Sequence, residues 1–194
     1  MKKRNIGLLF GAFALGALGF LQPVKANTYR SLGVKDLSSL SKSPASIGFK
    51  GKVINIEDTK DHQRVTFEIQ EVLRGDVPRE STLTLNFKKP AQLHTLGWPQ
   101  QKVPVFSRDE ESVLFVTQNV RGEDFFIGGE DQSRFYVKKV GSRSLIWNGL
   151  GNRNLIDTQS TNTLMRAIVN DMQGRNEGSI DYQDFKKLLD QTQE

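Results

Sequence analysis

Histidine, serine and carboxylate side chains are the groups of this chain best suited to acid–base or nucleophilic chemistry. His62 lies in a polar turn and His94 in a long loop, and the chain has no cysteine. Nucleophilic catalysis needs a serine or cysteine beside a general base, and zinc sites need clustered histidine and cysteine. The sequence places neither pattern around these histidines, so we predict no catalytic residue, no metal site and no cofactor. Paired carboxylates for glycoside hydrolysis remain an open alternative, because a sequence does not give their separation.

Residues 173–184 are similar to the second half of a calcium-binding EF-hand loop, with Gly178 at the sharp turn. In that alignment the third ligand position falls on Arg175 and the twelfth on Asp184. An arginine beside the ion would oppose binding, and aspartate is shorter than the usual bidentate glutamate. The pattern favours the alternative of two helices joined by a turn at Gly178, with Asp181 near the start of the second helix. The calcium affinity of this segment stays open.

The long loop over residues 91–109 is the strongest candidate binding element. It has no hydrophobic period, it contains His94, Trp98 and Phe106, and Pro99 and Pro104 stiffen it. Long loops without secondary structure often carry function, and aromatic anchors are typical of protein interfaces. We therefore predict that Trp98, Phe106 and His94 bind a protein partner. The alternative is that Trp98 fills the end of a barrel.

The first 26 residues have the order of a secretory signal peptide. Three cations at residues 2–4 precede an uncharged stretch from Ile6 to Leu21, and a cleavage site of small-residue type follows at residues 24–26, which read VKA. This stretch has 16 residues, fewer than the roughly 20 that a spanning helix needs. We predict cleavage after Ala26, export to the periplasm or the extracellular space, and no stable membrane span after cleavage.

The formal charge of +5 comes mainly from this leader. Four of the 27 basic residues and none of the 22 acidic residues lie in residues 1–26, which leaves a net charge of +1 for the remaining 168 residues. A nucleic-acid-binding protein normally has a basic run or face. Here acids and bases are mixed, so we predict no nucleic-acid partner. The absence of cysteine means that the core alone must hold the fold.

A change from helical to alternating hydrophobicity begins at Ser46 and predicts a run of short strands. The first two strands read as a long hairpin, and the apolar phase shifts by one residue near Glu71, as at a β-bulge or strand exit. Residues 113–116 form a continuous apolar run, which is typical of a buried central strand. The strands are expected over residues 46–56, 65–69, 82–87, 113–116, 125–128, 134–140 and 144–148.

Helical spacing flanks these strands on both sides. A short helix is expected over residues 34–40, and two more over residues 164–172 and 182–191. We therefore predict a mainly β protein, a small Greek-key (OB-like) barrel with a C-terminal helical hairpin packed on it. The expected layout is a signal peptide over residues 1–26, a lead-in over 27–45, the barrel over 46–150 and a helical appendage over 151–194.

Four segments of the expected barrel carry a resemblance to a known family. They are GKVI at residues 51–54, VTFEIQEVLRG at 65–75, PVF at 104–106 and VLFV at 113–116. Their order resembles that of secreted bacterial proteins whose domain is similar to the OB-like barrel of tissue inhibitors of metalloproteinases and of netrin modules. The resemblance covers about residues 46–148 and implies an OB-like barrel without an assigned activity.

The chain departs from those inhibitors at the residue that matters for inhibition. They place a cysteine at the mature N-terminus to grip the catalytic zinc, whereas this chain would begin at Asn27. The inhibitory mechanism therefore does not carry over. We predict an exported, non-enzymatic binding module for a protein partner. The alternatives are a regulator or inhibitor of a secreted protease, which rests on fold analogy, and a structural or assembly protein of the envelope.

Overall fold

The computed structural model defines a mainly β protein with a C-terminal helix. The predicted signal peptide, His94 and Trp98 lie outside the described residues. The structure describes residues 36–42, 46–77, 82–89, 105–153, 155–156, 163–173 and 178–192.

The predicted long hairpin is confirmed as strands β1 (Ser46–Asp58) and β2 (His62–Arg74). The Thr59 hydroxyl closes its turn, since it accepts from the His62 N–H over 3.0 Å and donates to the His62 carbonyl over 2.8 Å. Phe49 lies opposite Val72 and Gly48 opposite Arg74, so the residue between them on β2 is the extra one of a bulge. The predicted phase shift near Glu71 is therefore a β-bulge. Further register shifts bend both strands.

Five strands form a partial ring. After β1 and β2 come β3 (Thr82–Lys88), β4 (Glu111–Gln118) and β5 (Asp124–Phe126). Antiparallel pairing joins β1 to β2, β2 to β3, β4 to β5 and β4 to β1, and a single parallel pair, Phe87 with Asp124, joins β3 to β5. The last of these strands is shifted from the expected 125–128, because Gly128 and Gly129 have positive φ angles and form the following turn.

Side chains close the ring where β3 and β5 meet through that one pair. The Asn86 N–H donates to Asp124 Oδ2 over 2.7 Å. Lys88 Nζ lies 3.1 Å from Glu123 Oε1, with both side chains largely buried, and His62 Nε2 lies 3.4 Å from the same oxygen. We call the group Asn86, Lys88, Glu123 and Asp124 the seam. It brings charged groups inward at a place where backbone pairing is sparse.

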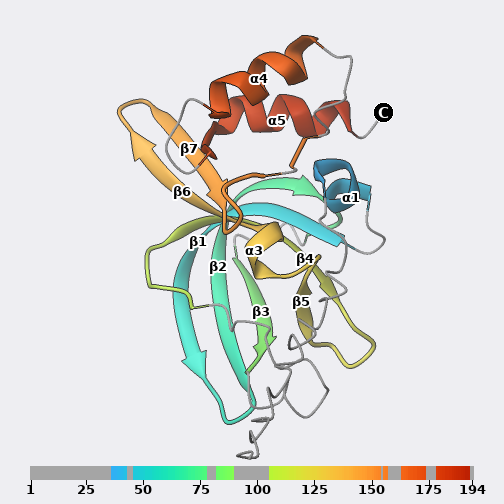
Figure 1. Ribbon diagram of the computed structural model, residues 1–194. Helices are drawn as coiled ribbons and strands as arrows, with labels where there is room; N and C mark the ends of the chain where they lie inside the picture. The colour runs from blue at the N-terminus through green and yellow to red at the C-terminus, as the bar shows by residue number, and fades with distance from the viewer. Residues whose placement is uncertain are drawn as a thin grey trace, which may run out of the picture.

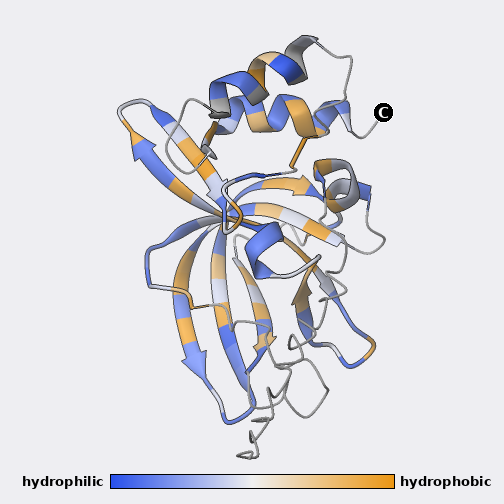
Figure 2. Ribbon diagram, viewed as in Figure 1, coloured by the Kyte–Doolittle hydropathy of each residue, from blue (hydrophilic) through white to orange (hydrophobic). Residues whose placement is uncertain are grey.

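Two hydrophobic cores lie on opposite sides of β4. Leu114 and Val116 belong to the core inside the ring, whereas Val113 and Phe115 belong to a second core under the C-terminal helix. All four are fully buried. A strand that is buried on both faces reads as a continuous apolar run, so the expectation of a buried central strand at residues 113–116 is confirmed. Figure 2 shows the alternation of apolar and polar residues along the other ring strands.

The sheet continues beyond the ring through a second hairpin. Helix α3 (Glu130–Ser133) leads into β6 (Arg134–Val140), which pairs with β4 over three residues only, and β7 (Arg143–Asn148) returns along β6. The tip of this hairpin is the turn at Gly141 and Ser142, and it points away from the ring (Figure 1). Its inner face is anchored by Phe135 and Ile146, which are fully buried in the second core.

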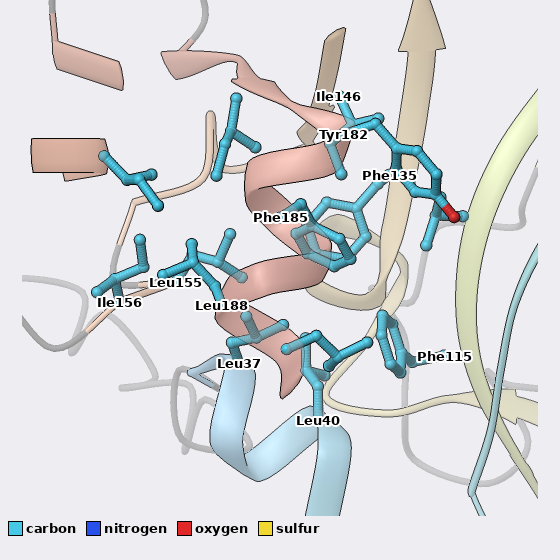
Figure 3. Close-up of a cluster of buried hydrophobic side chains, with 14 of the residues drawn as sticks. Leu37, Leu40, Phe115, Phe135, Ile146, Leu155, Ile156, Tyr182, Phe185 and Leu188 are labelled. Atoms are coloured by element: carbon cyan, nitrogen blue, oxygen red, sulfur yellow. The ribbon is translucent and has the colours of Figure 1, made fainter. Parts of the chain in front are cut away.

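The second core is completed by helices from both ends of the chain. Helix α1 (Leu37–Lys42) supplies Leu37 and Leu40, and α5 (Tyr182–Gln191) supplies Phe185 and Leu188. These side chains converge on Phe115 and Phe135 (Figure 3). Helix α4 (Thr163–Gln173) adds Ile168. The predicted helix over residues 34–40 is thus described from Leu37 and extends two residues further, whereas the bounds expected for α5 are met.

A two-residue strand that was not predicted, β8 (Ile180–Asp181), precedes α5 and pairs with Leu145 and Ile146 of β7. Asp181 then caps α5, its side chain accepting from the Gln183 N–H over 2.9 Å. Gly178 has a φ of +61°, and a Cβ there would lie 2.2 Å from the Gly151 carbonyl oxygen. The glycine is therefore required by a close approach of two backbones.

Candidate interaction surface

Of the three predicted binding residues, Phe106 is the one that the structure describes. Its ring is 5% exposed and lies inside the barrel, 5.3 Å from the Phe67 centroid and 5.4 Å from that of Phe87. The side chain therefore packs in the ring core and does not lie on the surface. His94 and Trp98 lie outside the described residues, so their role as binding residues stays a prediction.

Arg134, at the first position of β6, covers the Phe106 ring. Its guanidinium carbon lies 4.1 Å from the ring centroid, which is cation–π geometry. Nη2 donates to the Val105 carbonyl over 2.9 Å and to Glu110 Oε1 over 2.7 Å, and Nη1 donates to Glu130 Oε1. Burying an arginine is costly unless it is paired, and here it has two carboxylates and a carbonyl. Its Nε has no partner within the described part of the chain.

Glu110 extends this arrangement to the turn before β4. Its Oε2 accepts from the Ser107 N–H over 3.1 Å, and its Oε1 accepts from the Ser112 hydroxyl over 2.8 Å. Asp109, in the same turn, has a φ of +67° and forms an exposed ion pair with Lys52 at 2.7 Å. The charged side chains thus fix the chain from Val105 to Ser112 against the base of the second hairpin.

On the outer face of that hairpin, aromatic residues continue from Arg134. Tyr136 lies 4.9 Å from the guanidinium carbon and pairs across the strands with Trp147, with the ring centroids 6.0 Å apart. Both rings are half-buried. Because opposite residues of an antiparallel pair share a face, the register places six side chains here. We call this set the hairpin face: Tyr136, Lys138, Val140, Arg143, Leu145 and Trp147.

The hairpin face is apolar at its base and cationic toward its tip. Lys138 and Arg143 are exposed, and neither forms an ion pair within the described residues. On the opposite face Lys139 is paired with Glu111 at 2.6 Å. Val140, at the end of β6, is 43% exposed. The arrangement can hold an apolar or aromatic group beside an anionic one.

The sequence analysis missed this surface, although a signal was present. Residues 132–156 contain no acidic residue and five basic ones, and Tyr136 and Trp147 lie among them. The net charge of +1 over residues 27–194 does not reveal this local excess of basic residues. The sequence around Arg134 gives no sign that it is buried, because its burial depends on contacts with Phe106 and Glu110 from an earlier part of the chain, whereas only Glu130 is a local partner.

A second polar cluster attaches the C-terminal helix to the ring. The Tyr182 hydroxyl donates to Glu71 Oε2 over 2.8 Å, and Lys186 Nζ donates to Glu71 Oε1 over 3.0 Å. Burial would raise the pKa of Glu71, but the hydrogen bonds from Lys186 and Tyr182 outweigh it and hold that pKa below its usual value. Burial and the Glu71 carboxylate raise the pKa of Tyr182, so this phenol stays a donor.

The imidazole of His62, considered above for acid–base chemistry, contacts Glu123, with Nε2 3.4 Å from Oε1, and the backbone N–H of His62 donates to the Thr59 hydroxyl. In the part of the chain that the structure describes, no three histidine or carboxylate side chains gather as metal ligands. The described helices include none that is long and apolar enough to cross a membrane. No family model matches the chain, and no curated protein matches it.

Proposed function

We propose that the protein is an exported, non-enzymatic module that binds a protein partner through the hairpin face. The observation that carries this proposal is the continuous contact row from Phe106 through Arg134 and Tyr136 to Trp147. The row links a rigid core to a half-exposed aromatic pair, and rigid aromatic anchors are what protein interfaces use. Residues 105–109 are the described end of the predicted loop, and Phe106 among them begins this row, so the proposal adds Tyr136 and Trp147 as its anchors.

The proposal includes an OB-like Greek-key barrel with a C-terminal helical hairpin, as the resemblance to the inhibitor and netrin domains implies. Supporting it, β4 pairs with β1 on the side away from β2, which gives the strand order β4-β1-β2-β3. A fourth strand that returns by a long connection to the first is the arrangement of a Greek key. The OB fold is a five-stranded, partly open Greek-key barrel of this kind.

The buried polar groups favour binding over catalysis, because their hydrogen bonds and ion pairs join parts of the fold. Lys88 and Asp124 bridge the seam, Glu71 and Tyr182 hold the C-terminal helix, and Arg134 holds the chain at Val105. Asn148 accepts from the Leu150 and Asn152 N–H groups and orders the turn after β7. Each group is bonded to another element of the fold, which is the pattern of structural side chains.

Affinity capture from envelope and secreted fractions tests the proposal, with the chain from residue 27 onward as bait. One stoichiometric partner is expected with the unaltered chain. Trp147→Ala should lose it while retaining the thermal unfolding midpoint to within a few degrees. The control is Val120→Ala, which truncates a fully exposed valine in another turn and should retain the partner. Equal capture by Trp147→Ala would contradict the proposal.

A further inference from the structure

We propose that the partner segment is an extended acidic peptide, which adds as a strand along the open edge of β6 beside the hairpin face. This inference rests on the proposed function and specifies the chemistry of the partner. Three features of the second hairpin carry it: a strand edge that no described residue pairs with, two cations without ion partners among the described residues, and aromatic side chains on the face that the added strand would share.

The open edge begins where β4 stops. β4 pairs with β6 from Leu114 to Ser112, opposite Arg134 to Tyr136, and within the described residues no strand pairs with β6 beyond that point on this side. The free stretch ends at Val140, which lies opposite Arg143 across the turn. Hydrogen-bonded and non-hydrogen-bonded pairs alternate along an antiparallel ladder. With Val140 and Arg143 as the closing pair of a two-residue turn, the backbone groups of Val137 and Lys139 are directed to the open edge.

An added strand would pair with those groups and would place alternate side chains on the hairpin face. Directly opposite residues of neighbouring strands have Cβ atoms about 4.5–5.5 Å apart. The nearest side chains of this protein would be Tyr136, Lys138 and Val140. An apolar residue of the peptide suits Tyr136, and an acidic one suits Lys138. This is recognition by β-strand addition, in which the main chain gives affinity and alternate side chains give specificity.

Charge selects an acidic segment of a protein over other anions. Residues 134–148 carry four cations and no acid, and two of these cations, Lys138 and Arg143, are unpaired within the described residues. A lysine on an open edge would repel a basic strand and attract an acidic one. A nucleic acid needs a broad basic surface, whereas the mature chain has a net charge of +1. Two cations beside an open strand edge fit a short acidic strand.

Three synthetic probes test the inference against the chain from residue 27 onward, by fluorescence anisotropy at low and high salt. The first is a short peptide in which glutamate and valine alternate along one face of the strand, with threonine on the other face. The second has lysine in place of glutamate. The third is the acidic peptide N-methylated at its threonines, which removes the N–H groups that would face Val137 and Lys139 of β6. We expect saturable binding of the first alone, weakened by salt, with amide shifts at Val137 and Lys139 in nuclear magnetic resonance spectra.

Charge-reversal variants place the binding on this edge. Lys138→Glu with Arg143→Glu should weaken the acidic peptide by about tenfold or more. The matched control is Lys60→Glu, an exposed lysine in the turn between β1 and β2, and it should leave binding unchanged. Equal binding of the N-methylated or lysine peptide, or no binding of the acidic peptide, overturns the inference, as does tighter binding of a single-stranded oligonucleotide.

The failure of this inference is distinguishable from failure of the proposed function. If a partner is captured through Trp147 but the acidic peptide neither binds nor competes, the proposed function stands and the strand-addition inference is overturned. The lysines of β6 would then serve as protection of an edge against unwanted pairing. Competition of the captured partner by the acidic peptide supports both.

Discussion

The backbone N–H of Asn86 donates to the side chain of Asp124 over 2.7 Å, and this bond supplements the single backbone pair between β3 and β5. Asp124 is nearly inaccessible to solvent, and its other carboxylate oxygen accepts from Gln118. Burial raises its pKa above the usual value, against the opposing effect of these hydrogen bonds. The ring is therefore closed by a carboxylate that is costly to ionise.

Asp124→Asn should preserve or raise stability at neutral pH, because the amide oxygen still accepts from Asn86 and carries no charge. The folded-state pKa of Asp124 lies above the unfolded value of 3.8. Its contribution to stability is therefore full below that unfolded value and is lost as the pH rises through the folded pKa. Urea unfolding of both proteins from pH 4 to 7 should show the variant gaining relative to the parent as the pH rises. A parallel pair of curves would contradict this.

Asp124→Ala provides the matched comparison for that experiment. It removes the same charge but leaves the Asn86 N–H without its acceptor, so a loss of about 1–3 kcal/mol in unfolding free energy is expected. Opposite signs for the asparagine and alanine variants would separate the cost of the charge from the value of the hydrogen bond.

Glu123→Gln should destabilise the protein by about 3 kcal/mol, because it leaves Lys88 buried without its ion partner. Burial would raise the pKa of Glu123, but hydrogen bonds from Lys88 and Asn119 outweigh it, and the net pKa is lowered from 4.5. Stability from this pair is present above that value and is lost as the pH falls through the lowered pKa. Acid unfolding monitored by circular dichroism should show this loss in the parent protein but not in the variant. Lys88→Met with Glu123→Leu should recover much of the stability.

Arg134→Met should cost about 3 kcal/mol or more, because the Glu110 and Glu130 carboxylates lose their buried partner. The methionine still covers Phe106, so the loss would come from charge and hydrogen bonding and not from an empty space. Arg134→Lys should recover only part, since an ammonium group cannot reproduce the planar guanidinium fork. Thermal unfolding measures both. An unaltered midpoint for the methionine variant would show that the cluster contributes nothing net.

Gly178→Ala should destabilise the protein far more than Gly141→Ala, although both glycines have a φ of +61°. A Cβ at residue 141 meets nothing within 4 Å, so that variant bears only the backbone cost of about 1–2 kcal/mol. At residue 178 the same atom would meet the Gly151 carbonyl oxygen at 2.2 Å. The difference between the two unfolding free energies measures the close approach alone. Equal losses would mean that the backbone at residue 178 shifts freely.

Tyr182→Phe should lower the unfolding free energy by about 1 kcal/mol, the usual value of one hydrogen bond. The bond to Glu71 is lost, while Lys186 still neutralises the carboxylate. Chemical denaturation measures the difference, with Lys187→Ala as a control for an exposed ion pair at the helix surface. A loss as large for the control would argue against a special role for the tyrosine.

The local pattern of apolar and polar residues predicted those elements whose burial follows from their own sequence. The run at residues 113–116 indicated a strand buried on both faces, and the spacing after Asp181 indicated α5 to the residue. Strand β8 was missed because two residues have no period, and only pairing with β7, more than thirty positions earlier, makes them a strand. Phe106 illustrates the same limit: its place in a long loop predicted a binding residue, but the sequence does not show that Arg134 and the ring core enclose its ring.

The position of β4 between two cores has a consequence for how the chain unfolds. Val113 and Phe115 contact the layer under α5, and Leu114 and Val116 contact the ring interior, so neither half retains its packing if this strand leaves. The ring and the C-terminal helices should therefore melt in one cooperative transition with coincident probes. In a chain without disulfides, this coupling means that packing in each half stabilises the other half. The ring should therefore not fold when the C-terminal segment is removed.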